Sequence, residues 1–159
     1  AQGIIEQIQL HPYARDLLAD AVPEVTMLAI DPGTGLLVKM RADGICDGHD
    51  LILDLKTAQD ASYESFAKNA GKFRYHLQAA LYRWVYRLVC ERTPGFLHIV
   101  VETEPPYAVA VYDLDEEAVK AGEQRMRVGL NRWAECQRTG VWTSYPREIV
   151  SLSLPRWAL

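Results

Sequence analysis

An alternating stretch at residues 50–57 constrains the fold more than any other part of the sequence. It reads DLILDLKT, with leucine at positions 51, 53 and 55. Successive side chains of a β-strand point to opposite faces, so this pattern predicts a strand with one apolar face. Asp54 and Lys56 are two residues apart and therefore lie together on the other face. The alternation fixes the side of the sheet on which this charged pair lies.

A second alternating stretch, residues 37–43, lies just upstream and ends at Asp43. If the two strands pair as a hairpin through a short loop at residues 44–49, Asp43 comes close to Asp54. Two carboxylates and the Lys56 ammonium group would then converge on one spot. The inward-facing residues of this stretch would be Val38, Met40 and Ala42.

Carboxylate oxygens are the ligands that Mg²⁺ prefers, and one or two of them together with substrate phosphates form a typical site. A nearby lysine can hold a nucleophilic water or stabilise charge in a transition state. This combination points to metal-assisted hydrolysis of a phosphodiester. An ordinary alternative is an Asp-Gly turn at Asp43 and a simple ion pair between Asp54 and Lys56.

The composition is that of a single globular domain. The chain has 159 residues, of which 49% are hydrophobic, and this is enough for a real core. The sequence contains no apolar run of the roughly 18 residues that a membrane span needs. The net charge of −4 is unlike that of a non-specific DNA coat. It does not exclude a nuclease, because an acidic metal site subtracts from the total and a local basic groove can hold DNA.

Three isolated cysteines, without a Cys-x-x-Cys pair, argue against a disulfide framework and against a zinc or iron–sulfur site. A reducing cytoplasm is therefore the default compartment. The chain begins without an initiator Met or a signal-peptide pattern. We therefore expect residues 1–159 to form one domain that is truncated at its N-terminus.

The remaining patterns predict helices on both sides of this hairpin. Tyr75, Gln78 and Tyr82 lie at helical spacing and would share one face. Asp115 is a suitable N-cap and Gly140 a suitable end for a final helix. The fold class predicted is α/β, with a central mixed sheet of about five strands flanked by helices. The elements expected are two short helices within 4–19 with a break before Pro12, strands at 25–30, 36–43 and 50–56, a short helix at 62–69 ended by Gly71, a long helix at 75–92, strands at 96–101 and 107–112, a helix at 115–138 and an extended tail at 142–159.

Three segments together resemble the PD-(D/E)XK nuclease superfamily: 41–44 (RADG), 54–57 (DLKT) and 75–82 (YHLQAALY). Within it, the chain looks most like the RecE-type exonuclease VIII group of phages and prophages. The resemblance runs from Glu24 to Trp157 and implies a restriction-endonuclease-like core.

The resemblance also implies a metal site. Asp43 and Asp54 would ligate Mg²⁺, or Mn²⁺ in its place, with the carbonyl of Leu55 as a further ligand. Glu24 would stand where many relatives carry an acidic residue that touches the metal directly or through water.

Three further residues would serve the chemistry by the same resemblance. Lys56 would act on the attacking water. Gln78 and Tyr82 would orient the lysine and the DNA phosphate.

The sequence departs from the superfamily at two places. Ala42 replaces the proline that usually precedes the first aspartate. Relatives also carry a metal-binding histidine in an upstream helical region, and we assign no residue to that role. His49, His76 and His98 match nothing in the pattern, so each is expected to be a surface or packing histidine.

The function expected from the resemblance is a Mg²⁺-dependent exonuclease that degrades linear duplex DNA from its ends, 5′ to 3′, in phage-type homologous recombination. A single-strand annealing protein would be its partner, a homo-oligomer its assembly and the bacterial cytoplasm its location, with no membrane contact. The alternatives are a RecB-like or Cas4-like nuclease module, or a catalytically silent nucleic-acid-binding module of the same fold. The missing cysteine cluster counts against the iron–sulfur Cas4-like branch.

Overall fold

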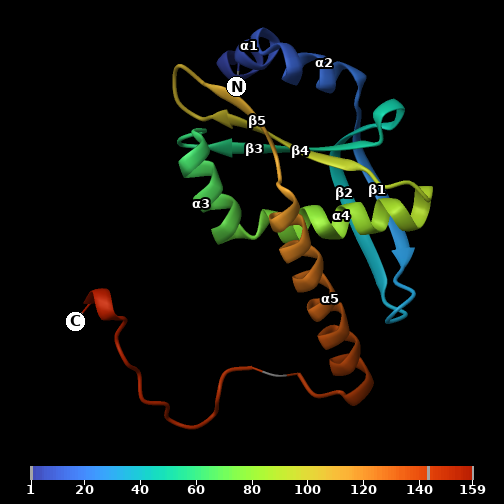
Figure 1. Cartoon of the computed structure of the whole chain (residues 1–159), viewed down its shortest axis with the longest axis vertical. Helices are drawn as coiled ribbons and strands as arrows, with labels where there is room; N and C mark the ends of the chain where they lie inside the picture. The colour runs from blue at the N-terminus through green and yellow to red at the C-terminus, as the bar shows by residue number, and fades with distance from the viewer. Residues whose placement is uncertain (1, 143, 159) are drawn as a thin grey trace.

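The computed structural model describes residues 2–142 and 144–158 and is built on one mixed sheet (Figure 1). The strands follow the order β1-β2-β3-β4-β5, which is also their order in the chain. Only β3 and β4 are parallel, because two helices carry the chain across between them. The strands are β1 (Val22–Ile30), β2 (Leu37–Cys46), β3 (Leu51–Ala58), β4 (Gly95–Glu102) and β5 (Val109–Asp113).

Helices cover both faces of the sheet, so the predicted α/β class with about five strands is confirmed. One face carries α1 (Gln2–Leu10) and α2 (Pro12–Asp20), with Ala14 of α2 buried against the sheet. Figure 1 shows α4 (Tyr75–Cys90) crossing the other face, with α3 (Tyr63–Phe73) beside it and α5 (Glu116–Thr139) descending from it.

The main hydrophobic core lies between α4 and the sheet. Met40, Ile52 and Phe96 enter it from three neighbouring strands, and Val85 and Tyr86 enter it from α4. All five side chains are at most 4% exposed. The burial of so much apolar surface fixes α4 against β2, β3 and β4.

The hairpin loop between β2 and β3 is shorter than the sequence predicts. β2 continues through Gly44 to Cys46, and a single 3-10 turn (Asp47–His49) makes the connection. Gly44 pairs with Leu53 inside the sheet. The interpretation of Asp43-Gly44 as a hairpin turn is therefore wrong, because the turn lies three residues later.

Helix boundaries agree with the sequence where a capping residue marks them. Asp115 accepts a hydrogen bond from the Ala118 backbone N–H, and Gly140 ends α5 at a φ of 70°. The predicted end of α3 at Gly71 is wrong, since the helix runs on to Phe73. Arg74 makes the break instead, with a left-handed φ of 59°.

The N-terminal helices break before Pro12 as predicted, with the His11 side chain accepting from the Ala14 backbone N–H. The segment after α5 extends away from the body of the molecule (Figure 1), and its described residues include a 3-10 turn at Arg156–Ala158. Thr143 and Leu159 of the predicted tail lie outside the described residues. No described helix is long and apolar enough to cross a membrane.

Candidate active site

Asp54 is the centre of a hydrogen-bonded cluster between the sheet and α4. It pairs with His98 in the parallel register of β3 and β4, and it is only 2% exposed. Lys56 Nζ lies 2.6 Å and His98 Nδ1 lies 3.0 Å from Asp54 Oδ2. Gln78 Nε2 of α4 donates to Asp54 Oδ1 at 2.7 Å. Both carboxylate oxygens are thus held by donors, as a buried carboxylate requires.

These contacts keep Asp54 ionised despite its burial. Burial alone would raise the pKa of the carboxyl, because desolvation disfavours the charged form. The hydrogen bonds from His98 and Lys56 act in the opposite direction and outweigh it, so the pKa of Asp54 lies below its ordinary value. Asp54 is therefore an anion at neutral pH.

Asp43 lies where β2 changes the face that it presents to α4. Ala42 and Ile45 both enter the core beneath α4 although they are three residues apart. Strict alternation would put them on opposite faces, so the strand switches sides between them. At this switch Asp43 Oδ2 accepts a hydrogen bond of 2.7 Å from the Leu55 backbone N–H. The Asp43 carboxylate is thereby anchored to the residue between Asp54 and Lys56.

Lys56 connects the buried carboxylate with the open side of the cluster. Its ammonium group lies 5.0 Å from the centre of the Tyr75 ring, in addition to its contact with Asp54. The Lys56 side chain is 19% exposed, against 3% for Asp54. The ring and the carboxylate together direct the ammonium group without burying it fully.

The other predicted site residues on α4 differ in whether they reach the Asp54 cluster. Tyr75, Gln78 and Tyr82 share one face of α4, as expected, and this face looks onto the sheet. Tyr82, however, contacts the ring of Phe96 and packs on the core. Of the described polar contacts from this face, the one from Gln78 reaches the charged cluster. Gln78 orients the aspartate directly and the lysine only through it.

Glu24 lies on β1 and forms an ion pair with Arg41 of β2. Its backbone has a φ of 57°, and both side chains of the pair are more than half exposed. The arginine therefore occupies the carboxylate that the resemblance assigns to the metal. The metal-binding role of Glu24 stays a prediction.

Sequence reasoning missed His98, which is fully buried and touches Asp54. It was expected to be a surface or packing histidine. One signal pointed to it: a single ionisable residue interrupts the apolar run of 96–101. The run alone did not show which residue of β3 lies opposite.

The donor chemistry of the cluster fits a hard divalent cation. Asp43, Asp54 and the Leu55 carbonyl offer oxygen atoms from adjacent positions of two strands. No three His, Cys, Asp or Glu side chains gather as a metal site in the part of the chain that the structure describes. Two carboxylates completed by backbone, water and substrate oxygens are the kind of ligand set that hard divalent cations take.

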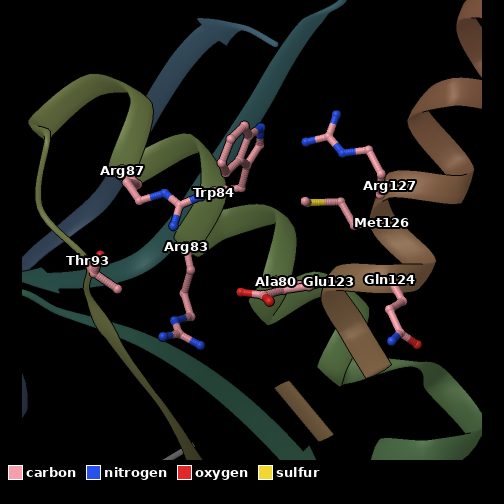
Figure 2. Close-up of a pocket in the computed structure, with 9 residues that line it drawn as sticks. All are labelled: Ala80, Arg83, Trp84, Arg87, Thr93, Glu123, Gln124, Met126 and Arg127. Atoms are coloured by element: carbon pink, nitrogen blue, oxygen red, sulfur yellow. The ribbon is translucent and has the colours of Figure 1, made fainter. Parts of the chain in front are cut away.

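A separate pocket of about 370 Å³ lies between α4 and α5 (Figure 2). Figure 2 shows Trp84 and Arg127 pointing toward one another, and the Arg127 guanidinium lies 5.2 Å from the indole centre. Asp31, fully buried, accepts hydrogen bonds from both side chains. None of the predicted site residues lines this pocket, so it is a helix-packing feature distinct from the Asp54 cluster.

Comparisons with known proteins agree with this fold. The family described as "PDDEXK-like domain of unknown function (DUF3799)" matches residues 1–152. The crystal structure of a "Putative exonuclease" from Eubacterium rectale superposes with a TM-score of 0.73 at 15% sequence identity, covering 97% of this chain and 62% of that one. The crystal structure of SSO0001 gives a TM-score of 0.43 at 20% identity, covering 78% of this chain and 57% of that one. No curated protein matches the chain. Because the family match spans nearly the whole sequence, the chain belongs to the DUF3799 family of PDDEXK-like domains.

Proposed function

We propose that the protein is a divalent-metal-dependent DNA nuclease. The observation that carries this proposal is the hydrogen bond that holds the Asp43 carboxylate at the backbone of Leu55, the residue between Asp54 and its ion-pair partner Lys56. Such a group is costly to bury and is unnecessary for holding a sheet together. It suits the hydrolysis of a phosphodiester.

Each residue has a distinct task in the proposed reaction. Asp43, Asp54 and the Leu55 carbonyl would hold Mg²⁺, or Mn²⁺ in its place, and Lys56 would orient the attacking water. The bound cation would supply Lewis-acid stabilisation of the charge that develops on the phosphate. Gln78 keeps Asp54 in place through its amide.

The substrate proposed is the end of linear duplex DNA, degraded 5′ to 3′. Support comes from the three motif segments, which resemble the RecE-type exonucleases, and from a fold shared with the crystal structure described as a "Putative exonuclease". We place the protein in phage-type homologous recombination in the bacterial cytoplasm, with a single-strand annealing protein as its partner. We also propose a homo-oligomer, for which the exposed apolar side chains of the C-terminal segment are the support.

The test is release of nucleotides from linear duplex labelled at the 5′ or the 3′ end, with Mg²⁺ or with EDTA. Lys56→Ala and Asp54→Asn should each lower the rate at least ~10²-fold, as removal of a charge-stabilising group does. Lys39→Ala on β2 is the matched control, because this lysine is exposed and outside the cluster. Its rate should equal that of the parent.

The pattern of products separates the alternatives. Mononucleotides released from the 5′-labelled end support the proposed polarity, while cleavage of closed circles would indicate an endonuclease. DNA binding without any hydrolysis would identify the catalytically silent module. Hydrolysis that survives Lys56→Ala would contradict the proposed role of the lysine.

A further inference from the structure

His98 is a buried polar residue whose position the core does not require. It is 0% exposed and lies on β4 with apolar neighbours on both sides in the sequence. Its Nε2 atom has no hydrogen-bond partner among the described residues. Buried polar atoms are nearly always paired, so an unpaired one calls for a reason other than packing. An aliphatic residue would fill the same space without that cost.

The contacts determine which nitrogen of the ring carries the proton. Nδ1 lies 3.0 Å from Asp54 Oδ2, and this oxygen can only accept while the carboxyl is ionised. A proton on Nε2 instead would leave a buried donor unpaired and would set two acceptors against each other. The ring is therefore assigned as a donor through Nδ1, with Nε2 as a bare acceptor.

Aromatic rings hold the imidazole in this orientation. The centroids of Phe96, Phe66 and Tyr75 lie 5.1, 5.4 and 5.6 Å from that of His98. Tyr75 is also the ring over which the Lys56 ammonium group lies. The same aromatic shell thus confines His98 and the candidate catalytic lysine.

Asp54 Oδ2 is shared by two donors of different mobility. Lys56 reaches it through a long, partly exposed side chain, whereas His98 reaches it from a rigid, fully buried ring. If Lys56 turns away to serve a water molecule or a phosphate, His98 still restrains the carboxylate. A second donor of this kind, behind a metal ligand, fixes the direction in which the ligand's free lone pairs point.

We propose that His98 is a positioning residue of the active site, which holds Asp54 through Nδ1 so that the carboxylate is presented to the divalent cation. This proposal rests on the proposed nuclease function. It assigns His98 no contact with substrate. It requires that metal binding and cleavage depend on the hydrogen-bond donor at the Nδ1 position rather than on the bulk of the ring.

The experiment compares His98→Asn, His98→Gln and His98→Leu with the parent protein. An asparagine amide reaches the place of Nδ1, whereas a glutamine amide reaches the place of Nε2, so these two polar variants differ in the position of the donor. Phe66→Leu loosens the aromatic shell and leaves the donor in place, and it serves as the packing control. Three quantities are measured: binding of Mn²⁺ to the DNA-free protein by electron paramagnetic resonance, kcat and KM on linear duplex, and the midpoint of urea unfolding.

We expect His98→Leu to weaken Mn²⁺ binding about 10-fold and to lower kcat by a similar factor, with KM for DNA unchanged. His98→Gln should resemble it, and His98→Asn should stay within about 3-fold of the parent. Phe66→Leu should lower the unfolding midpoint more than it changes Mn²⁺ binding. If His98→Leu does not fold, the comparison of the Asn and Gln variants carries the test.

Equal Mn²⁺ affinity and kcat in the parent and in the Leu or Gln variant would overturn the positioning role while leaving the nuclease intact. So would an Asn variant as impaired as the Gln variant at equal stability. A parent protein that neither binds Mn²⁺ nor cleaves DNA would instead refute the proposed function, and the positioning role with it.

Discussion

Gln78 is the only described side chain of α4 that donates a hydrogen bond to Asp54. Its amide therefore restrains the orientation of the Asp54 carboxylate relative to the helix. Gln78→Ala should lower kcat for duplex cleavage about 10-fold, because Asp54 Oδ1 loses its donor and the carboxylate gains freedom to rotate. Gln78→Glu should be worse, because a second carboxylate would then face Asp54 at hydrogen-bond distance. Steady-state cleavage of labelled duplex measures both effects.

Gln124→Ala is the control for this pair of variants. Gln124 lies on α5 in the pocket of Figure 2, away from the cluster, and its loss should leave kcat unchanged. A Gln78→Glu protein that cleaves as fast as the parent would show that Asp54 Oδ1 takes no part in the reaction.

The residues of the cluster differ in how far the sequence reveals them. Asp54 and Lys56 follow from two-residue periodicity, and Asp43 follows because a short antiparallel connection leaves little freedom in register. His98 does not follow, because β4 is parallel to β3 and is reached through α3 and α4. No short-range rule sets the register across such a crossover, so the Asp54–His98 pair emerges only from the packed fold.

At the scale of elements, the close approach of α4 and α5 depends on Gly122. A Cβ atom added there would lie 2.1 Å from the His76 backbone carbonyl oxygen of α4. Because backbone cannot yield as a flexible side chain can, Gly122→Ala should force the helices apart. We expect a loss of about 2–4 kcal/mol in the free energy of unfolding, typical of severe overpacking.

Gly129→Ala on the same helix provides the matched comparison. A Cβ atom there meets nothing within 4 Å, so only helix propensity changes. This variant should gain about 0.5–1 kcal/mol of stability. Urea unfolding of both proteins would measure the two effects, and equal midpoints would contradict the helix contact.

Asp31 links the turn after β1 to α4 and α5 through hydrogen bonds. Its fully buried carboxylate accepts hydrogen bonds from Thr34, Trp84 and Arg127. Burial would raise the pKa of this carboxyl, but the three donors outweigh burial and hold the pKa below its ordinary value. Asp31→Asn should cost about 1–3 kcal/mol, less than a fully buried ion pair would, because Arg127 is partly exposed.

The lowered pKa of Asp31 also gives a pH dependence with a definite sign. The unfolded chain binds the proton more readily, so the stabilisation is complete above the unfolded pKa of about 3.9 and is lost as the pH falls through the folded pKa. Asp54 acts in the same direction. Unfolding midpoints between pH 6 and pH 3 should therefore fall less steeply for Asp31→Asn than for the parent, and parallel curves would contradict this linkage.

Element boundaries were predictable where chemistry marks them in the sequence. Asp115 and Gly140 bracket α5 because an N-cap acceptor and a left-handed glycine are local requirements. The end of α3 escaped prediction because Gly71 is tolerated inside the helix, while Arg74 adopts the left-handed conformation that the break needs. Phe66 and Ala70 of α3 are buried, and tertiary packing of such a face stabilises a helix beyond what local propensity supports.

At the scale of the whole molecule, the cluster exists only when every layer is assembled. Asp43 comes from β2, Asp54 and Lys56 from β3, His98 from β4 and Gln78 from α4. The site therefore depends on the mixed sheet and on the helix that covers it, and no single hairpin could reproduce it. This dependence is why the order of the strands in the sheet matters for the site more than any one motif.

One apolar segment takes no part in this assembly within a single chain. Residues 150–154 read VSLSL and lie between Pro146 and Pro155, an alternation typical of a strand. Leu152 is 88% exposed in the structure. Leu28 and Ile30 are exposed along β1, which stands at the edge of the sheet. An unpaired edge and a strand-forming apolar segment complement one another, so a second copy of the chain is the partner we propose for the segment.

Val150→Asp with Leu152→Asp should therefore shift the protein from oligomer to monomer, because the charges lie on the apolar face of the segment. The matched variant, Ser151→Asp with Ser153→Asp, adds the same charge to the opposite face and should remain an oligomer. Light scattering coupled to size-exclusion chromatography, at several protein concentrations, gives the mass of each. If both variants keep the mass of the parent, the segment does not hold the copies together, and if the parent is a monomer the homo-oligomer is refuted. If both variants dissociate alike, the added charge rather than loss of the apolar face causes the dissociation, because the two variants carry the same charge and differ only in the face that bears it.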